Sequence, residues 1–210
     1  MTSSCASRRC APIAGAYSEP GVPEPGPAEF SRALFKVTGL IESADAPYII
    51  FGAVAVGIWG RIRATLDVDV MIQADDVGLS HLEAAAEAAG LAVDRRWLEW
   101  NPQRSGIQLR LILEPYRADL VRAMDAHDHA SMERRRRVDW RGRSLWVVSP
   151  EDLILQKLKA QRDQDLIDAV GVVEEQHGRL DQQHLELWAR RLGVEQELAY
   201  VLTGGQFDFG

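Results

Sequence analysis

Hydrophobic positions recur with two different periods along this chain, and the periods predict where helices and strands lie. Helical spacing covers residues 30–43, 53–61, 76–89, 150–176, 181–192 and 194–202. Short apolar or alternating runs, which are typical of strands, cover residues 48–51, 66–72, 91–100, 107–113 and 118–121, and a hairpin pattern covers 138–148. Because strands and helices alternate, we expect an α/β (α+β) fold with a mixed sheet flanked by helices.

The same patterns divide the chain into three parts. Residues 1–29 are rich in proline, glycine and serine and have few large apolar side chains, so we expect a disordered tail there. The core of sheet and helices covers residues 30–148. Helical spacing dominates residues 149–210, where Ser149 suits an N-cap and Pro150 suits the first helical position. This last part is predicted to form a C-terminal helical lobe.

Composition and charge set limits without naming a function. Hydrophobic residues make up 46% of the chain, enough for a sizeable core, and the formal net charge is −7. Since phosphates repel an acidic surface, nucleic acid would need a local basic patch to bind. The two cysteines, Cys5 and Cys10, build no disulfide framework, and no apolar run reaches about 18 residues. We therefore expect a cytoplasmic protein that does not span a membrane.

Two carboxylates, Asp67 and Asp69, lie two residues apart on the strand predicted for residues 66–72. Side chains at positions i and i+2 share one face of a strand, so the two point the same way, about 7 Å apart along the chain. A hard divalent cation such as Mg²⁺ binds oxygen ligands of this kind and relieves their repulsion. The alternative interpretation is an exposed strand face with two hydrated aspartates, because Asp-x-Asp is a common pattern.

A glycine turn precedes this pair. The apolar strand of residues 48–51 runs into Gly52 and Ala53 and then directly into a predicted helix. Small residues let a phosphate approach the backbone, and the first turn of a helix offers unpaired N–H groups and the positive end of the helix dipole. Gly52, Gly57 and Gly60 do not match the dinucleotide fingerprint, and the sequence has no Gly-Lys-Ser/Thr P-loop. The order of strand, turn and carboxylate strand predicts phosphoryl chemistry.

These motifs together resemble a known family. The segment Gly52-Ala53-Val54-Ala55 … Arg63-Ala64-Thr65-Leu66-Asp67-Val68-Asp69 resembles the Gly-Gly-x-Ala … Arg-x-Thr-x-Asp-x-Asp pattern of minimal nucleotidyltransferases. These belong to the DNA polymerase beta superfamily, and the AbiEii/MenT-type branch, often the toxin half of type IV toxin–antitoxin systems, looks most similar. The resemblance covers about residues 30–175. It implies a nucleotidyltransferase-like fold and a Mg²⁺-dependent enzyme, with Mn²⁺ as an alternative ion, that moves a nucleoside monophosphate from a triphosphate to a hydroxyl.

The resemblance also implies roles for individual residues. The family supplies a third carboxylate from a later strand, and Asp119 in Arg117-Ala118-Asp119-Leu120-Val121 takes that place, which makes Asp67, Asp69 and Asp119 the expected metal ligands. The helix after Ser149-Pro150 resembles the family's helix with an active-site lysine, here Lys157. The expected catalytic residues are then Asp67, Asp69, Asp119 and Lys157. The expected nucleotide-binding residues are Gly52, Ala53, Arg63, Thr65, Lys157 and Asp165.

Spacing within the lysine helix bears on these roles. Lys157 falls on the apolar stripe of the helix, whereas Lys159 points away from it. A lysine on such a stripe either snorkels to solvent or holds a phosphate in a cleft. If the helix of residues 150–176 is unbroken, Lys157 and Asp168 point within about 20° of each other. Arg162 and Asp165 are spaced for an i, i+3 ion pair.

Partners and alternatives complete the prediction. Besides a nucleoside triphosphate, the toxin resemblance implies a cognate antitoxin. The run Arg134, Arg135, Arg136 and Arg137 is either a solvated face or a site for an RNA (tRNA) acceptor. The family commonly has Gly or Ser where this chain has Ala53, which puts the phosphate grip in doubt. Two alternatives stay open: a non-catalytic nucleotide- or partner-binding module, and a nucleotidyltransferase for small molecules such as aminoglycosides.

Overall fold

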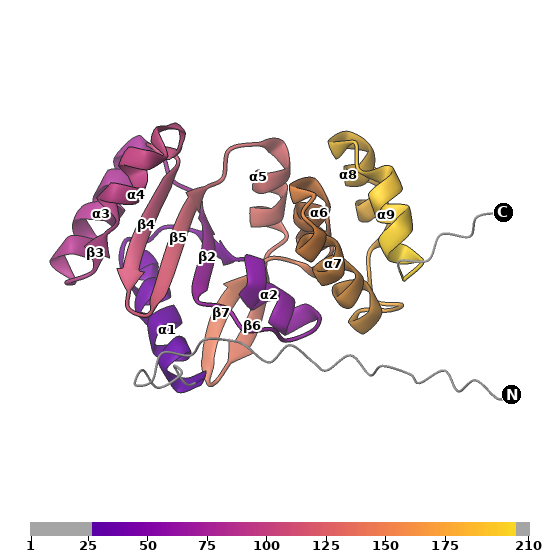
Figure 1. Ribbon diagram of the computed structural model, residues 1–210, viewed down its shortest axis with the longest axis horizontal. Helices are drawn as coiled ribbons and strands as arrows, with labels where there is room; N and C mark the ends of the chain where they lie inside the picture. The colour runs from indigo at the N-terminus through magenta and orange to yellow at the C-terminus, as the bar shows by residue number, and fades with distance from the viewer. Residues whose placement is uncertain (1–26, 205–210) are drawn as a thin grey trace, which may run out of the picture.

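The computed structural model describes residues 27–204, and one seven-stranded mixed sheet lies at its centre (Figure 1). The strands are β1 (Tyr48–Ile50), β2 (Asp67–Ile72), β3 (Ala92–Val93), β4 (Gln108–Leu113), β5 (Tyr116–Arg122), β6 (Arg136–Trp140) and β7 (Arg143–Val147). Their order across the sheet is β3-β4-β5-β2-β1-β7-β6. β2 pairs in parallel with β5 and antiparallel with β1, and β1 pairs in parallel with β7. This confirms the predicted mixed α/β fold.

Helices cover both faces of the sheet. They are α1 (Pro27–Ser43), α2 (Gly52–Trp59), α3 (Asp76–Ala88), α4 (Arg95–Trp100), α5 (Ala126–Glu133), α6 (Pro150–Ala160), α7 (Asp163–Glu175), α8 (Gln182–Leu192) and α9 (Glu195–Leu202), with a 3-10 turn at Pro102–Arg104. α1 packs against β5 and α3, whereas α2 packs against β2, α6 and α7. Figure 1 shows α6 to α9 gathered beside α2 and α5, on the side of the molecule away from α3.

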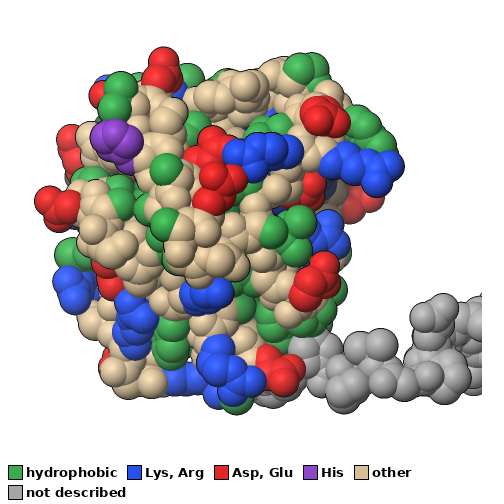
Figure 2. All heavy atoms as spheres, turned by 90° about the vertical axis from the view of Figure 1, so that its left-hand side faces the viewer, with side chains coloured by type: hydrophobic (Ala, Val, Ile, Leu, Met, Phe, Trp, Pro, Cys, Tyr) green, Lys and Arg blue, Asp and Glu red, His purple; other side chains and the backbone are tan. Residues whose placement is uncertain are grey.

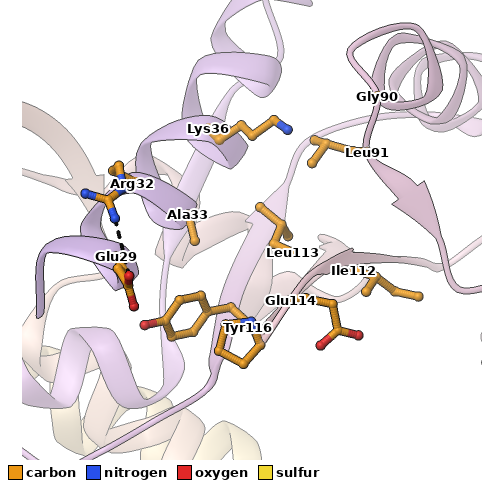
Figure 3. Close-up of a pocket in the computed structure, with 11 residues that line it drawn as sticks. Glu29, Arg32, Ala33, Lys36, Gly90, Leu91, Ile112, Leu113, Glu114 and Tyr116 are labelled. Carbon is orange, nitrogen blue, oxygen red and sulfur yellow. Dashed lines mark ion pairs between the residues drawn. The ribbon is translucent and has the colours of Figure 1, made fainter. Parts of the chain in front are cut away.

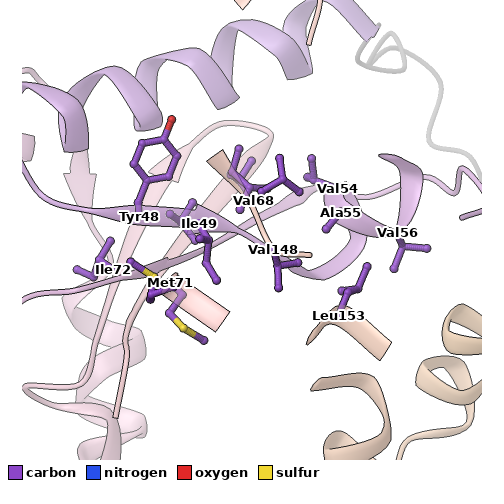
Figure 4. Packing of buried hydrophobic residues seen from close by; sticks show 14 of the residues in the cluster. Tyr48, Ile49, Val54, Ala55, Val56, Val68, Met71, Ile72, Val148 and Leu153 are labelled. Atoms are coloured by element: carbon purple, nitrogen blue, oxygen red, sulfur yellow. The ribbon is translucent and has the colours of Figure 1, made fainter. Parts of the chain in front are cut away.

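One hydrophobic cluster joins the C-terminal helices to the sheet. Val56 of α2, Val148 at the end of β7 and Leu153 of α6 are at most 1% exposed and lie together (Figure 4). Full burial of such side chains stabilises a fold by about 1.5–3 kcal/mol each. α6 is therefore anchored to the sheet through α2, which fixes where Lys157 can lie. This cluster contains residues of both the predicted core (residues 30–148) and the predicted helical lobe (residues 149–210). The domain boundary at residue 149 therefore stays a prediction.

The predicted strand of residues 91–100 is wrong beyond Val93. The chain instead turns into α4 at Arg95, because the side chain of Asp94 caps that helix by accepting from the backbone N–H of Trp97 at 2.9 Å. An N-cap aspartate followed by a short helix outweighs the strand propensity of the apolar and aromatic residues around it.

The predicted continuous helix of residues 150–176 is also wrong. It begins as expected, with the Ser149 hydroxyl accepting from the backbone N–H of Asp152 at 3.1 Å and Pro150 in the first turn. It then ends at Ala160, because Gln161 adopts a left-handed conformation with φ of 55°. α7 starts at Asp163 and packs back against α6. The hydrophobic residues keep a helical period on both sides of Gln161. The sequence pattern therefore does not show that the chain changes direction there.

α5 lies where no helix was predicted. Asp125 and Asp128 form a capping box at its start, each side chain accepting from the other's backbone N–H. At the other end of the chain, α1 begins at Pro27, so residues 27–29 are helical and not part of a tail. The remaining predicted tail, including Cys5 and Cys10, lies outside the described residues. Within residues 27–204, no helix is both long and apolar enough to cross a membrane.

Candidate active site

The glycine turn and the carboxylate strand meet at the start of α2. The antiparallel pairing of β1 and β2 brings Phe51 to Asp69, where the backbone N–H of Phe51 donates to the backbone carbonyl of Asp69 at 3.0 Å. Gly52 follows with φ of +62°, and a Cβ added there would lie 2.0 Å from Asp69 Oδ2. Glycine at this position is therefore what allows the carboxylate of Asp69 to lie against the first residue of α2.

α2 begins without a side-chain cap. Phe51 occupies the N-cap position, and no side-chain hydrogen bond caps the helix there. The first N–H groups of a helix have no partner within the helix, and they carry the positive end of its dipole. Ala53 keeps its backbone donor while its side chain is buried. An element suited to bind an anion thus begins beside the carboxylate of Asp69.

Asp67 and Asp69 share a face of β2 but differ in environment. Asp67 is exposed at the start of the strand, and Asp69 is half-buried. Burial, followed by the charges of Asp119 and Asp67, raises the pKa of Asp69 to about 6, while Lys157 and Arg162 act in the opposite direction. Without a bound cation, the anionic form of the Asp69 carboxyl is therefore disfavoured. Two carboxylates on one face, one of them destabilised as an anion, are a donor set that fits Mg²⁺.

Asp119 lies opposite Asp69 in the parallel pairing of β2 and β5. Both of its oxygens accept hydrogen bonds from Arg110 of β4, Nε to Oδ1 and one terminal nitrogen to Oδ2, each at 2.7 Å. A carboxylate between apolar strand neighbours is costly to bury without a partner, and here that partner is an arginine. Within residues 27–204, no group of three or more His, Cys, Asp or Glu side chains is arranged to hold a metal ion. A third metal ligand at Asp119 stays a prediction.

Lys157 lies on the buried stripe of α6, and Lys159 points away from it to pair with Asp125, as the spacing predicted. Lys157 Nζ donates to Asp165 Oδ1 and to Asp168 Oδ2, both at 2.8 Å. The turn at Gln161 brings these carboxylates back over the lysine. The proximity of Lys157 and Asp168 was predicted, but it arises from the break and not from a continuous helix. The amine is paired inside the protein rather than snorkelling to solvent.

The two carboxylates that hold Lys157 have arginine partners as well. Arg162 Nε donates to Asp165 at 2.6 Å, which confirms the predicted i, i+3 pair, and Arg63 contacts both oxygens of Asp168 at 3.2 Å. Burial acts to raise the pKa of Asp165 and of Asp168. Hydrogen bonds from Arg162 and Lys157 to Asp165, and from Lys157 to Asp168, outweigh it and hold both pKa values below the usual range. Arg63 thus ties the loop after α2 to α7.

Two further residues shape the carboxylate strand. The Thr65 hydroxyl accepts from the backbone N–H of Asp67 and donates to its carbonyl, both at 3.1 Å, so Thr65 fixes the strand start. Arg110 was missed at the level of sequence. Its signal was the polar pair Gln108 and Arg110, which alternates with leucines in the strand predicted for residues 107–113. Side chains at i and i+2 share a face, so an arginine there must meet whatever lies on that face.

The arginine run does not form one exposed patch. Arg134 contacts three acidic side chains at 3.5–3.6 Å, those of Glu151, Asp152 and Asp181. Arg135 and Arg137 lie over the ring of Trp146, at 4.6 and 4.7 Å from its centroid, and Arg136 is exposed. On the face of the molecule shown in Figure 2, basic and acidic side chains are interspersed and not separated by sign. An RNA site at these arginines stays a prediction.

A cavity of about 440 Å³ lies between α1 and the turn from β4 to β5 (Figure 3). Arg32 and Lys36 of α1 and Tyr116 of β5 are among its lining residues. Tyr116 and Asp119 are three residues apart on one strand, so their side chains point to opposite faces of the sheet. The cavity therefore lies across the sheet from the carboxylates, and none of the predicted site residues lines it.

Comparisons with known proteins bear on the family and the fold. The sequence model of the family "Nucleotidyltransferase of unknown function (DUF6036)" matches residues 32–189. Among solved structures, the antibiotic-resistance factor ANT(2'')-Ia is similar with a TM-score of 0.55 and 13% identity, over 82% of this chain and 98% of that one. An antigenic nucleotidyltransferase-like protein from Paracoccidioides brasiliensis is similar with a TM-score of 0.50 and 15% identity, over 85% and 94% of the two chains. No curated protein matches. At these identities the structural likeness shows the fold alone.

Proposed function

Since the chain belongs to the DUF6036 nucleotidyltransferase family and is an enzyme of that class, we propose that it transfers a nucleoside monophosphate from a nucleoside triphosphate to a hydroxyl acceptor. The observation that carries the proposal is the contact between the two motifs: Asp69 lies against Gly52, at the uncapped start of α2. Carboxylates for a metal ion and N–H donors for a phosphate thus lie side by side. A non-catalytic module, the first alternative, does not agree with membership in an enzyme family.

We propose Asp67 and Asp69 as the residues that hold Mg²⁺, or Mn²⁺ in its place. Both offer hard oxygen donors from one strand face, and the raised pKa of Asp69 indicates a site that gains from an added positive charge. When bound, the ion would neutralise charge on the triphosphate and on the oxygens that enter and leave. Mg²⁺ usually takes one or two carboxylates and completes its shell with water and phosphate oxygens, so two aspartates are sufficient.

The phosphates of the nucleotide would be bound by two groups other than the aspartates, namely the start of α2 and Lys157. The first N–H groups of α2, at Gly52 and Ala53, would donate to phosphate oxygens. Lys157 would supply a point charge, and its two carboxylate partners keep its amine in place at 2.8 Å. Asp165 would act on the nucleotide by positioning Lys157. For Arg63 and Thr65, which contact Asp168 and Asp67, we propose a supporting role in the same nucleotide site.

The reaction would proceed in line at the α-phosphorus. The acceptor oxygen forms a bond to that phosphorus as the bond to the bridging oxygen breaks, and pyrophosphate leaves. The proton of the acceptor hydroxyl passes to a carboxylate or to water. Asp119, opposite Asp69, is the candidate for a third metal ligand or for the group that orients this hydroxyl. As in phosphoryl transfer generally, positioning and electrostatics would carry the rate.

For the acceptor and the biological role, we propose an RNA or protein hydroxyl and an AbiEii-like toxin with a cognate antitoxin in the cytoplasm. The support is the motif Arg63-x-Thr65-x-Asp67-x-Asp69 together with the lysine helix, which resemble that branch. The second candidate acceptor is a small molecule such as an aminoglycoside. An acidic chain, with a net charge of −7, would attract such a cationic compound.

The test is transfer of radiolabel from each of the four α-labelled nucleoside triphosphates, with Mg²⁺, to total RNA, to the protein itself and to a panel of aminoglycosides. Asp69→Asn is the inactive control, because it keeps the volume of the side chain and removes its charge. Label that depends on Asp69 would name the nucleotide and the acceptor class together. Label that is the same in the variant, or the absence of label on every acceptor despite nucleotide binding, would contradict the proposal.

A further inference from the structure

Three charged side chains follow one another across one face of the sheet. Arg110 and Asp119 are opposite each other in the pairing of β4 and β5, and Asp119 and Asp69 are opposite in the pairing of β5 and β2. Residues that are directly opposite on one face interact across strands. Asp119 thus has a cation on one side and a carboxylate on the other.

The contact between Arg110 and Asp119 has the geometry of a strong ion pair. Two parallel hydrogen bonds of 2.7 Å join the guanidinium to the carboxylate, and the side chains are only 16% and 12% exposed. A pairing of this fork-to-fork type directs both carboxylate oxygens at the arginine. The oxygens of Asp119 are therefore turned toward β4 and away from Asp69.

A third residue holds the arginine in place. The centroid of the Trp97 ring lies 4.1 Å from Arg110 Cζ, so the ring covers the guanidinium. Trp97 is itself fixed, because its backbone N–H donates to the N-cap Asp94 at 2.9 Å. Stacking and hydrogen bonding together limit how far Arg110 can move to release Asp119.

We propose that Arg110 serves as a built-in cation for Asp119, so that the carboxylates of this site bind one divalent metal ion, at Asp67 and Asp69, and no second ion at Asp119. Arg110 is then a positioning residue, which acts through Asp119 by holding both oxygens of that carboxylate toward β4. The inference rests on the proposed metal-dependent function. Without Arg110, Asp119 would be a third uncompensated carboxylate beside Asp69, and a second divalent ion would relieve the repulsion.

The experiment counts bound Mn²⁺ directly, with no turnover involved. The full chain is titrated with Mn²⁺ alone, and bound ions are measured from the loss of the electron paramagnetic resonance signal of free Mn²⁺. The variants are Arg110→Gln, the double variant Arg110→Gln with Asp119→Asn, and the control Arg95→Gln. Arg95 of α4 forms its ion pairs with Glu83 and Glu87 of α3 and not with Asp119.

We expect one ion per chain for the wild type and for Arg95→Gln, two for Arg110→Gln, and one again when Asp119→Asn is added. The double variant separates a metal site at Asp119 from a general loosening of the protein. Two ions on the wild type would overturn the inference even if Arg110→Gln does not fold. One ion on a folded Arg110→Gln would also overturn it.

Failure of the proposed function has a different signature. A wild type that binds no Mn²⁺ would remove the metal site at Asp67 and Asp69 itself, and the inference about Arg110 would fall with it. Two ions on a wild type that still transfers label would leave the proposed function intact and overturn only the role of Arg110.

Discussion

Gly52 and Asp69 are in such close contact that no side chain fits between them: an added Cβ at Gly52 would lie 2.0 Å from Asp69 Oδ2 and 2.9 Å from Asp69 Cβ. Two motifs that are 17 positions apart in the sequence are thus one structural unit. The glycine lets the helix start approach the carboxylate, and the carboxylate fills the space that the missing side chain leaves.

Gly52→Ala is expected to lower the free energy of unfolding by about 1–2 kcal/mol from its positive φ alone, and further because the new Cβ meets Asp69. Nucleotide transfer should be lost, because Asp69 must move. Gly90→Ala is the matched control, since Gly90 has φ of +71° and nothing within 4 Å of an added Cβ. Chemical denaturation and the transfer assay compare the two. Equal losses of stability, with transfer kept in both, would show that the contact has no role.

Lys157→Ala is expected to cost about 3 kcal/mol of stability, because it leaves two buried carboxylates with one partner fewer. We also expect at least a tenfold weaker affinity for the triphosphate, about 1.4 kcal/mol. Lys159→Ala serves as the control: its side chain is 44% exposed and its ion pair with Asp125 is worth less than about 1 kcal/mol. Calorimetric titration with each nucleoside triphosphate measures the affinity. Unchanged affinity in Lys157→Ala would make this lysine purely structural.

In the metal-free protein, Asp69 makes stability depend on pH. Its pKa is raised from 3.8 to about 6 in the folded state, so its contribution to the free energy of unfolding is fully present below pH 3.8 and lost as the pH rises through 6. With a chelator present, the wild type should therefore gain stability relative to Asp69→Asn as the pH falls from about 7.5 to about 5. Mg²⁺ at the higher pH should stabilise the wild type and not the variant. Parallel pH curves for the two proteins would rule out this account of Asp69.

Arg134→Ala is expected to destabilise the fold by about 2 kcal/mol, because Glu151 and Asp152 are buried and lose a charged partner. Arg136→Ala should change stability by less than about 0.5 kcal/mol, since Arg136 is exposed. If an RNA acceptor binds this run, only Arg136→Ala should weaken RNA binding at low salt, independently of stability. A gel-shift titration with RNA and thermal unfolding of both variants check these expectations. A larger loss of stability in Arg136→Ala together with weaker RNA binding in Arg134→Ala would contradict them.

Much of the site could be predicted from local patterns. The alternation around Asp67 and Asp69 gives their strand and their shared face, because a period of two is a property of the backbone itself. The same holds for Gly52 at a strand-to-helix turn and for Lys157 on the buried stripe of α6. Ser149 as an N-cap also follows from short-range chemistry, since a cap and its helix lie within four residues.

The tertiary structure decided which charged residues of the site form ion pairs with one another. Arg110 faces Asp119 only because β4 and β5 pair in one particular register, and that register depends on how the whole sheet buries its apolar residues. Lys157 meets Asp165 and Asp168 because Gln161 turns the chain, whereas periodicity continues through the break unchanged. The sequence alone therefore determined the elements and the faces on which charges lie, since these are set by backbone geometry within a few residues. The ion pairs of the site follow from contacts between distant segments, which only the packing of the whole chain selects.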